Sequence, residues 1–286
     1  MTIRADSSSS KLPSGAVRRD VERHRGTQTT RFADAIAEEI PVAFVYNERP
    51  HAVMMATPVD LQDFALGFSL TEAIIATPQE FENVEVVPAL AGIELRIAIP
   101  AARAAKLEDR VRELTGRTGC GLCGAQTLEA AVRHPAPVPA PSRIDALALR
   151  RALSELQRRQ TINVATGATH AAAWANPQGE VELVREDVGR HNALDKLIGA
   201  MLRGGSDVRA GFPVVTSRAS YEMVMKAATA GIGALAAISA PTALAIALAQ
   251  ECNVTLIGFA RSDGFSVYAH AEHVHDAGVQ VLGAAS

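Results

Sequence analysis

Hydrophobic residues in the first half of the chain form short segments of the length and composition of β-strands. Four such segments are separated by polar or turn-forming residues: 40–46, 51–56, 84–87 and 93–99. Asn47–Pro50 is typical of a turn, so the first two segments predict a β-hairpin. In the last segment isoleucine and leucine alternate with Glu94 and Arg96, and Pro100 ends it. Together the four segments predict a small sheet.

Two helices are predicted to accompany this sheet. Apolar residues recur at helical spacing over 61–68, which predicts a helix with one buried face. Thr57 precedes Pro58, so we expect this helix to begin there, with Thr57 as its N-cap. A charged helix is predicted at 101–114, and it leads into a glycine-rich segment that carries two cysteines.

The second half of the chain alternates between the periods of helices and strands. We predict helices at about 144–158, at 192–202, after Ser220 and at 242–251. The predicted strands are 171–175, 180–184, 212–216, 235–238 and 254–259. This alternation is typical of a layered α/β domain with a mixed sheet.

Local composition indicates the boundaries between regions of the chain. The first residues are rich in serine and charge, and no hydrophobic region follows Arg18-Arg19, so we expect disorder rather than an export signal. The run PAPVPAPS predicts a stiff connector. We therefore predict four regions: a disordered tail at 1–30, an α+β region at 31–134, a connector at 135–142 and an α/β cofactor-binding domain at 143–286.

Charge and cysteine content narrow the classes of function. The chain has 286 residues, is 48% hydrophobic and has a net charge of −3, so nothing indicates a nucleic-acid partner. Only three cysteines are present, which argues against a disulfide scaffold and for a reducing compartment. One of them, Cys252, lies between a predicted helix and strand, and we expect it to be buried.

Residues 227–250 carry no charge and are long enough to span a membrane. Small residues dominate this run, however, and Ser239–Pro241 interrupt it. We therefore predict the end of one helix, a buried strand and the next helix, and no membrane partner.

Candidate chemistry centres on TGRTGCGLCGAQ at 115–126, where glycines surround Cys120 and Cys123. Glycine at this density disfavours a helix or strand, so we expect a mobile, exposed loop. A zinc site needs four ligands, and the nearest candidates for the rest are distant histidines, so we expect no metal. A redox dithiol usually lies at a helix N-terminus, for which there is no sign here. Sulfur transfer needs reach and exposure, and it fits this loop best; Arg117 would favour the Cys120 thiolate.

Three polar clusters follow predicted strands. The first is EDVGRHNALDK at 186–196, where Arg190, His191 and Asn192 lie at a helix start that can bind an anion; as an alternative, Asp187 or Asn192 only caps the helix. The others are 217–222 and 259–265. Because ligands bind at strand ends of open α/β sheets, the clusters predict one nucleotide-like pocket.

Four segments together resemble the formate dehydrogenase accessory sulfurtransferase family, FdhD. They are TGRTGCGLCG, EDVGRHNALDK, SRASYEMVMKA and GFARSDGFSVY, and the similarity runs in the same order over about 40–270. The resemblance implies a cytoplasmic homodimer with a cytidine-deaminase-like fold. The small residues at 227–249, which permit close packing, agree with a dimer.

The resemblance also implies an activity. A family member takes sulfane sulfur from a cysteine desulfurase and passes it to the molybdenum cofactor, bis-molybdopterin guanine dinucleotide (bis-MGD), before the cofactor enters formate dehydrogenase. The persulfide falls on Cys120, with Cys123 as its partner. The cofactor-binding turn falls on Phe259, Ala260, Arg261, Ser262, Asp263 and Gly264. GDP is the expected surrogate ligand, with Asp263 as a candidate reader of guanine and Arg261 as a phosphate ligand.

Two alternatives to sulfur transfer are deamination and non-enzymatic binding of a cofactor or metal. A zinc deaminase carries H-x-E and P-C-x-x-C. Here Gly119 precedes Cys120, and neither His24 nor His51 has Glu two residues later, so deamination is unlikely on sequence grounds. The other alternative is a non-enzymatic, cofactor-binding chaperone whose cysteines only hold a metal or the molybdenum cofactor.

Overall fold

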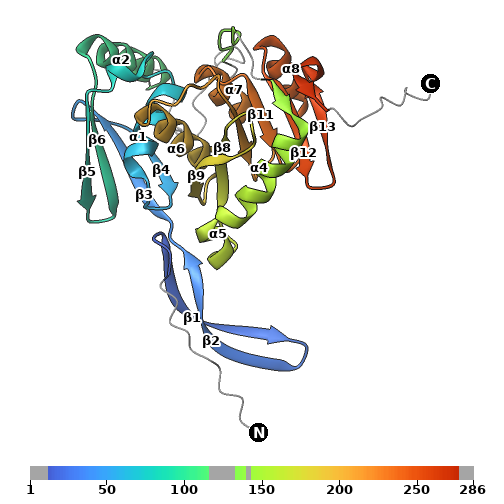
Figure 1. Cartoon of the computed structure of the whole chain (residues 1–286). Helices are drawn as coiled ribbons and strands as arrows, with labels where there is room; N and C mark the ends of the chain where they lie inside the picture. The colour runs from blue at the N-terminus through green and yellow to red at the C-terminus, as the bar shows by residue number, and fades with distance from the viewer. Residues whose placement is uncertain (1–11, 116–132, 140–142, 277–286) are drawn as a thin grey trace.

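A computed structural model describes residues 12–115, 133–139 and 143–276 of the chain (Figure 1). Cys120 and Cys123 lie outside these residues. The predicted mobility of the cysteine loop therefore stays a prediction.

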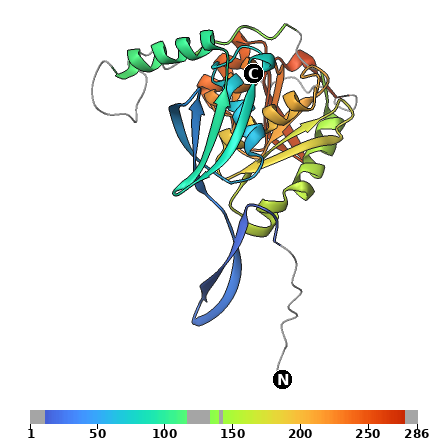
Figure 2. The same cartoon turned by 90° about the vertical axis from the view of Figure 1, so that its left-hand side faces the viewer.

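The N-terminal segment forms a two-stranded antiparallel ribbon, β1 (Ala16–Arg25) and β2 (Gln28–Ala37). The ribbon projects away from the body of the molecule in both views (Figures 1 and 2). The disorder predicted for 1–30 is therefore wrong from Ala16 onward. Most side chains on both faces of the ribbon are exposed, so the segment lacks the apolar alternation that reveals a half-buried strand.

The predicted small sheet is confirmed. Its order is β4-β3-β6-β5, with β3 at Ile40–Tyr46, β4 at Arg49–Ala56, β5 at Asn83–Ala89 and β6 at Gly92–Ala98. The turn residues Asn47 and Glu48 both have positive φ, as a tight hairpin requires. The 3₁₀ turn η1 (Pro78–Glu80) precedes β5, and helix α2 (Ala101–Thr115) follows β6.

Helix α1 (Leu61–Thr71) begins later than predicted. Its N-cap is Asp60, in the left-handed conformation, and not Thr57. Thr57 is fully buried, and its N–H donates to Asp187 while its hydroxyl accepts from the N–H of Val188. A residue that caps no helix thus connects the small sheet to the second half of the chain.

The second half builds a mixed six-stranded sheet of order β13-β12-β11-β10-β8-β9. Its strands are β8 (His170–Ala175), β9 (Val181–Asp187), β10 (Phe212–Val215), β11 (Ala234–Ala237), β12 (Thr255–Arg261) and β13 (Gly264–Ala269). The helices are α4 (Ala146–Arg159), α5 (Thr161–Thr166), α6 (Arg190–Arg203), α7 (Tyr221–Thr229) and α8 (Ala243–Glu251). The strands β10, β11 and β12 are parallel, and the other pairs are antiparallel. A short parallel pair, β7 (Ile144–Asp145) and β14 (Val274–His275), lies beside the turn η2 (Ala271–His273).

Alternate residues of this sheet enter two cores. Trp174, Val215 and Leu256 face the larger core with α1, α6 and α7, while Val214 and Ile257 face the smaller core with α4. The larger core also contains the small sheet, so both halves of the chain share it. The connector predicted at 135–142 consequently does not separate two cores.

Helices α1 and α6 lie side by side between the two sheets (Figure 1). Gly67 and Gly199 make this close approach possible. A methyl group on Gly67 would overlap the carbonyl of Asp195, and one on Gly199 would overlap the carbonyl of Asp63. The two helix backbones are therefore in direct contact.

The uncharged run 227–250 forms the end of α7, strand β11 and most of α8, as predicted. Within the part of the chain that the structure describes, no helix combines the length and hydrophobicity needed to cross a membrane. Cys252 is buried, as expected, and its thiol donates to the carbonyl of Pro135.

Candidate functional site

The three predicted polar clusters lie along one edge of the six-stranded sheet. Strands β9, β10 and β12 end at this edge, and antiparallel β8 begins there, with His170 opposite Asp187. The first cluster follows β9, the second follows β10 and the third follows β12. Four strand intervals separate β9 from β12, which at about 4.8 Å each is roughly 19 Å. The edge therefore suits an extended ligand better than a compact one.

The third cluster is the turn between β12 and β13. Arg261, Ser262 and Asp263 have exposed side chains, and the described residues offer neither Arg261 nor Asp263 a hydrogen bond or ion pair. Phe259 is 43% exposed and has a φ of 50°. Ala260 is fully buried, so it presents no surface to a ligand, and the cofactor contact predicted for it is wrong.

A shallow surface hollow of about 280 Å³ lies at this turn. It is lined by Phe259, Arg261, Asp263, Gly264, Phe265 and Ser266. The base of the turn is fixed by Gly258, where an added methyl group would collide with Pro241 and Tyr268. The N–H of Phe259 donates to the carbonyl of Ser239, 3.2 Å away, at the end of β11. An exposed aromatic ring, a cation and a carboxylate thus share one supported turn.

Three residues of the first cluster, Arg190, His191 and Asn192, lie in three different environments. Arg190 has a buried Nε that finds no hydrogen-bond partner among the described residues. His191 faces α7, with its Nε2 2.7 Å from a carboxylate oxygen of Glu222 and 3.4 Å from the Ser220 hydroxyl. Asn192 is buried, and its amide donates to Asp187 and to the carbonyl of Met55. Arg190 and His191 therefore keep capacity for a ligand, whereas Asn192 is used inside the protein.

Positive charge gathers beside this helix start. Burial lowers the pKa of His170, and the nearby charges of Arg190 and His191 lower it further. No side chain caps α6, because its N-cap is Gly189. The unpaired N–H groups of the first turn and the adjacent cations can together receive an anion.

A pocket of about 200 Å³ lies between the start of α6 and Arg133. Its lining comes from β4, α1, α6 and α7 and from Arg133: Met54, Phe68, Glu72, Arg133, His191, Asp195, Tyr221, Glu222, Met225 and Lys226. Arg133 is the first described residue after 116–132. Its guanidinium is 2.5 Å from Glu72, and its carbonyl accepts from the Tyr221 hydroxyl at 2.7 Å. Arg133 thus shares the lining of this pocket with His191 and Glu222.

Two groups of buried ion pairs lie behind this edge of the sheet, and neither was predicted from the sequence. Lys196 lies 2.7 Å from Asp187 with both side chains fully buried, and it also donates to the carbonyl of Thr57. These contacts join β9 and α6 to the segment before α1. The signal in the sequence is a lysine placed among apolar residues of a predicted helix, but the sequence does not show its partner.

The second pair is centred on Lys226, which lies 2.9 Å from both Asp195 and Glu72. Burial disfavours the charged amine, but these two carboxylates outweigh it and raise the pKa of Lys226. Burial likewise opposes the Glu72 carboxylate, and Lys226 and Arg133 outweigh it and lower the pKa of Glu72. Helices α1, α6 and α7 are held together by these charges.

A match to a protein-family model shows to which family the chain belongs. The model of the FdhD/NarQ family matches residues 37–275. The chain belongs to the FdhD/NarQ family. The resemblance drawn from the four sequence segments is thereby confirmed.

This FdhD/NarQ protein has similar relatives that are named Sulfur carrier protein FdhD. The protein of Xanthomonas campestris pv. campestris (strain B100) is 58% identical over 267 residues, which cover 93% of this chain and 95% of the relative. The protein of Cupriavidus necator is 50% identical over 258 residues, which cover 90% of each chain.

A solved structure shares the fold of this FdhD/NarQ protein. It is the crystal structure of a formate dehydrogenase accessory protein from Desulfotalea psychrophila, with a TM-score of 0.71 and 22% identity. The match covers 91% of this chain and 99% of the other. The mixed α/β architecture is therefore shared along nearly the whole chain.

Proposed function

We propose that this protein is a sulfurtransferase that carries sulfur as a persulfide on Cys120. A cysteine desulfurase would supply the sulfur, and the acceptor would be bis-MGD destined for formate dehydrogenase. The observation that carries this proposal is the placement of all three polar clusters on one sheet edge, in a chain 58% identical to a named sulfur carrier.

The transfer needs two displacement steps. The Cys120 thiolate attacks the outer sulfur of the donor persulfide, a new S–S bond forms, and the donor cysteine leaves as a thiolate. A nucleophilic atom of the acceptor would then attack the outer sulfur, so that the S–S bond breaks and Cys120 leaves as a thiolate. If the Cys123 thiolate instead attacks the inner sulfur, sulfide leaves and a Cys120–Cys123 disulfide forms.

The sheet edge offers complementary groups for a guanine nucleotide. Phe259 presents a ring face, and the Asp263 carboxylate can accept hydrogen bonds from both N1–H and the amino group of guanine. Arg261 lies beside it and can bind a phosphate. At the other end, Arg190 and His191 flank the α6 N-terminus, where further anionic groups can bind. An extended dinucleotide cofactor would contact both the turn between β12 and β13 and the start of α6.

The pocket at Arg133 supports a link between sulfur transfer and cofactor binding. Its lining includes both Arg133, which follows residues 116–132 in the sequence, and His191, a member of the proposed anion site. Sulfur delivered there would meet a part of the cofactor distant from the guanine bound at the turn. The homodimer, the cytoplasmic location and the cytidine-deaminase-like layering belong to the same proposal, on the strength of the family resemblance.

Mass spectrometry after incubation with a cysteine desulfurase and cysteine tests the persulfide. We expect one added sulfur on Cys120 in the wild type and none at this site in Cys120→Ala, with folding unchanged. Cys252→Ala is the matched control, because the Cys252 thiol is buried and should not be loaded. Wild-type protein that binds GDP but acquires no sulfur would replace the transferase with a cofactor-binding chaperone.

A further inference from the structure

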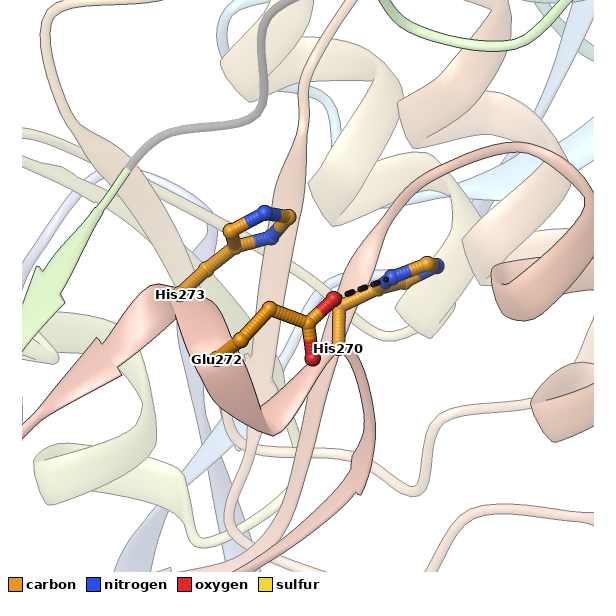
Figure 3. Close-up of side chains that lie close together, drawn as sticks. All are labelled: His270, Glu272 and His273. Carbon is orange, nitrogen blue, oxygen red and sulfur yellow. Dashed lines mark hydrogen bonds and ion pairs between the residues drawn. The ribbon is translucent and has the colours of Figure 1, made fainter.

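A second group of reactive side chains lies at the opposite edge of the six-stranded sheet. Strand β13 ends at Ala269, paired with Leu256 near the start of β12. The turn η2 follows and carries His270, Glu272 and His273 (Figure 3). This edge is the far end of β12 from the proposed guanine site, so what binds here is independent of the proposed function.

The three side chains converge. One ligand atom from each lies within 4.8 Å of the others. In Figure 3 the carboxylate of Glu272 points toward the His270 ring, and Nδ1 of His270 is 3.1 Å from its Oε1. The two imidazole rings are stacked, with centroids 5.6 Å apart and planes inclined by 16°.

Neighbouring groups orient both rings. Nε2 of His270 lies 3.3 Å from the carbonyl oxygen of Gln250, which can only accept, so this nitrogen carries the proton. In the neutral ring Nδ1 then presents a lone pair to the Glu272 carboxylate. Two acceptors at this distance need a cation between them, which is either a proton or a metal ion.

His273 is held in the same manner. Its Nδ1 is 3.1 Å from the hydroxyl of Thr255, a fully buried residue, which leaves Nε2 for a ligand. Metal-binding histidines characteristically donate their second ring N–H to such an outer partner. His270 also adopts a left-handed backbone conformation (φ 56°, ψ 54°), which is uncommon outside glycine.

We propose that His270 Nδ1, the Glu272 carboxylate and His273 Nε2 bind one Zn²⁺ ion, with water in the fourth position. Two imidazoles and a carboxylate form a donor set that zinc accepts in tetrahedral geometry. Zinc–ligand bonds of about 2.1 Å place ligand atoms about 3.4 Å apart. Separations of up to 4.8 Å must therefore close by as much as roughly 1.4 Å. The exposed Glu272 side chain, 67% accessible, can make that movement.

The ion would pin η2 against the end of α8 and the start of β12. Because β14 follows η2 directly and pairs with β7, it would also hold this strand pair in place. The expected consequence is thermal stabilisation, since an ion that binds only the folded chain shifts the folding equilibrium.

Calorimetric titration of Zn²⁺ into chelator-treated full-length protein tests the site. Cys120→Ser and Cys123→Ser are introduced throughout, so that the thiols cannot bind zinc. We expect one ion per chain and a rise in the melting temperature on zinc addition. Glu272→Gln and His273→Ala should each weaken binding by at least about 10- to 100-fold and abolish the rise.

His24→Ala is the matched control, because His24 forms a similar exposed pair with Glu22 at 3.1 Å in the N-terminal ribbon. It should leave the stoichiometry and affinity unchanged. Cobalt substitution gives a second readout, with tetrahedral visible absorption that disappears in His273→Ala. Absence of saturable binding of one ion, or binding that survives both substitutions in η2, overturns the proposal.

Discussion

The start of α6 and the turn between β12 and β13 lie on the same sheet edge but use their charged residues differently. At the start of α6, Asp187 and Lys196 are fully buried and paired with each other. In the turn, Arg261 and Asp263 face solvent, and the described residues provide them with no such partner. A polar cluster thus supports the fold where its charged groups pair across the core, and it can support binding where those groups lack partners.

Loss of the buried lysine should have the largest effect. Lys196→Met leaves the Asp187 carboxylate buried without its cation, which costs about 3 to 5 kcal/mol of folding free energy. Denaturant unfolding measures this loss. The matched change in the turn, Arg261→Met, should alter stability by no more than about 0.5 kcal/mol. Similar losses from both variants would remove the distinction between the two regions.

The helix crossing behind α6 should be nearly as sensitive. Gly67→Ala forces α1 away from the carbonyl of Asp195, and such overpacking costs up to about 3 kcal/mol. Gly264→Ala in the turn is the control, because no atom lies within 4 Å of its added methyl group. We expect a lower unfolding midpoint for the first variant alone. A fully stable Gly67→Ala protein would contradict the close approach of the two helices.

The ion pairs of Glu72 should make stability depend on pH. Burial opposes its charge, but Lys226 and Arg133 lower its pKa below the usual 4.5. The unfolded chain therefore binds more protons between that value and the folded pKa, and the stabilisation is lost as pH falls through this window. Glu72→Gln should cost about 1 to 2 kcal/mol at neutral pH, where the charge-assisted bonds are intact.

Unfolding of wild type and Glu72→Gln across acidic pH checks this prediction. The difference between the two proteins should shrink as pH falls below 4.5. A constant difference at every pH would show that Glu72 acts through packing and not through its charge.

The pattern of apolar and polar residues was sufficient to predict elements that bury one face and expose the other. Strand β6 alternates apolar residues with Glu94 and Arg96, so its period is visible in the sequence, and the hairpin at 40–56 could be predicted from two apolar runs that flank a turn. The ribbon β1–β2 is exposed on most of both faces, and its charged composition resembles that of a disordered tail. The helix start at Leu61 was missed because Thr57 uses its hydroxyl on a strand end that is 131 residues away.

The candidate site was predicted unevenly for a related reason. Strand ends and turns are local, so the position of the turn at 259–264 could be predicted. The partners of Lys196 and Lys226 depend on which helices pack together, and that is fixed by tertiary contacts such as the one at Gly67. The group at His270 was missed because its outer contacts, Gln250 and Thr255, lie on other elements.

Calorimetric titration of GDP and ADP tests most directly whether the exposed turn reads guanine. We expect wild-type protein to bind GDP more tightly than ADP, because adenine cannot offer the two donors that the Asp263 carboxylate accepts. Asp263→Ala should weaken GDP binding by about 1 to 3 kcal/mol and leave ADP binding unchanged. Ser266→Ala, at the margin of the same hollow, is the control and should bind GDP as the wild type does. Equal affinity for both nucleotides, or GDP binding unaffected by loss of Asp263, would contradict the assignment of this turn.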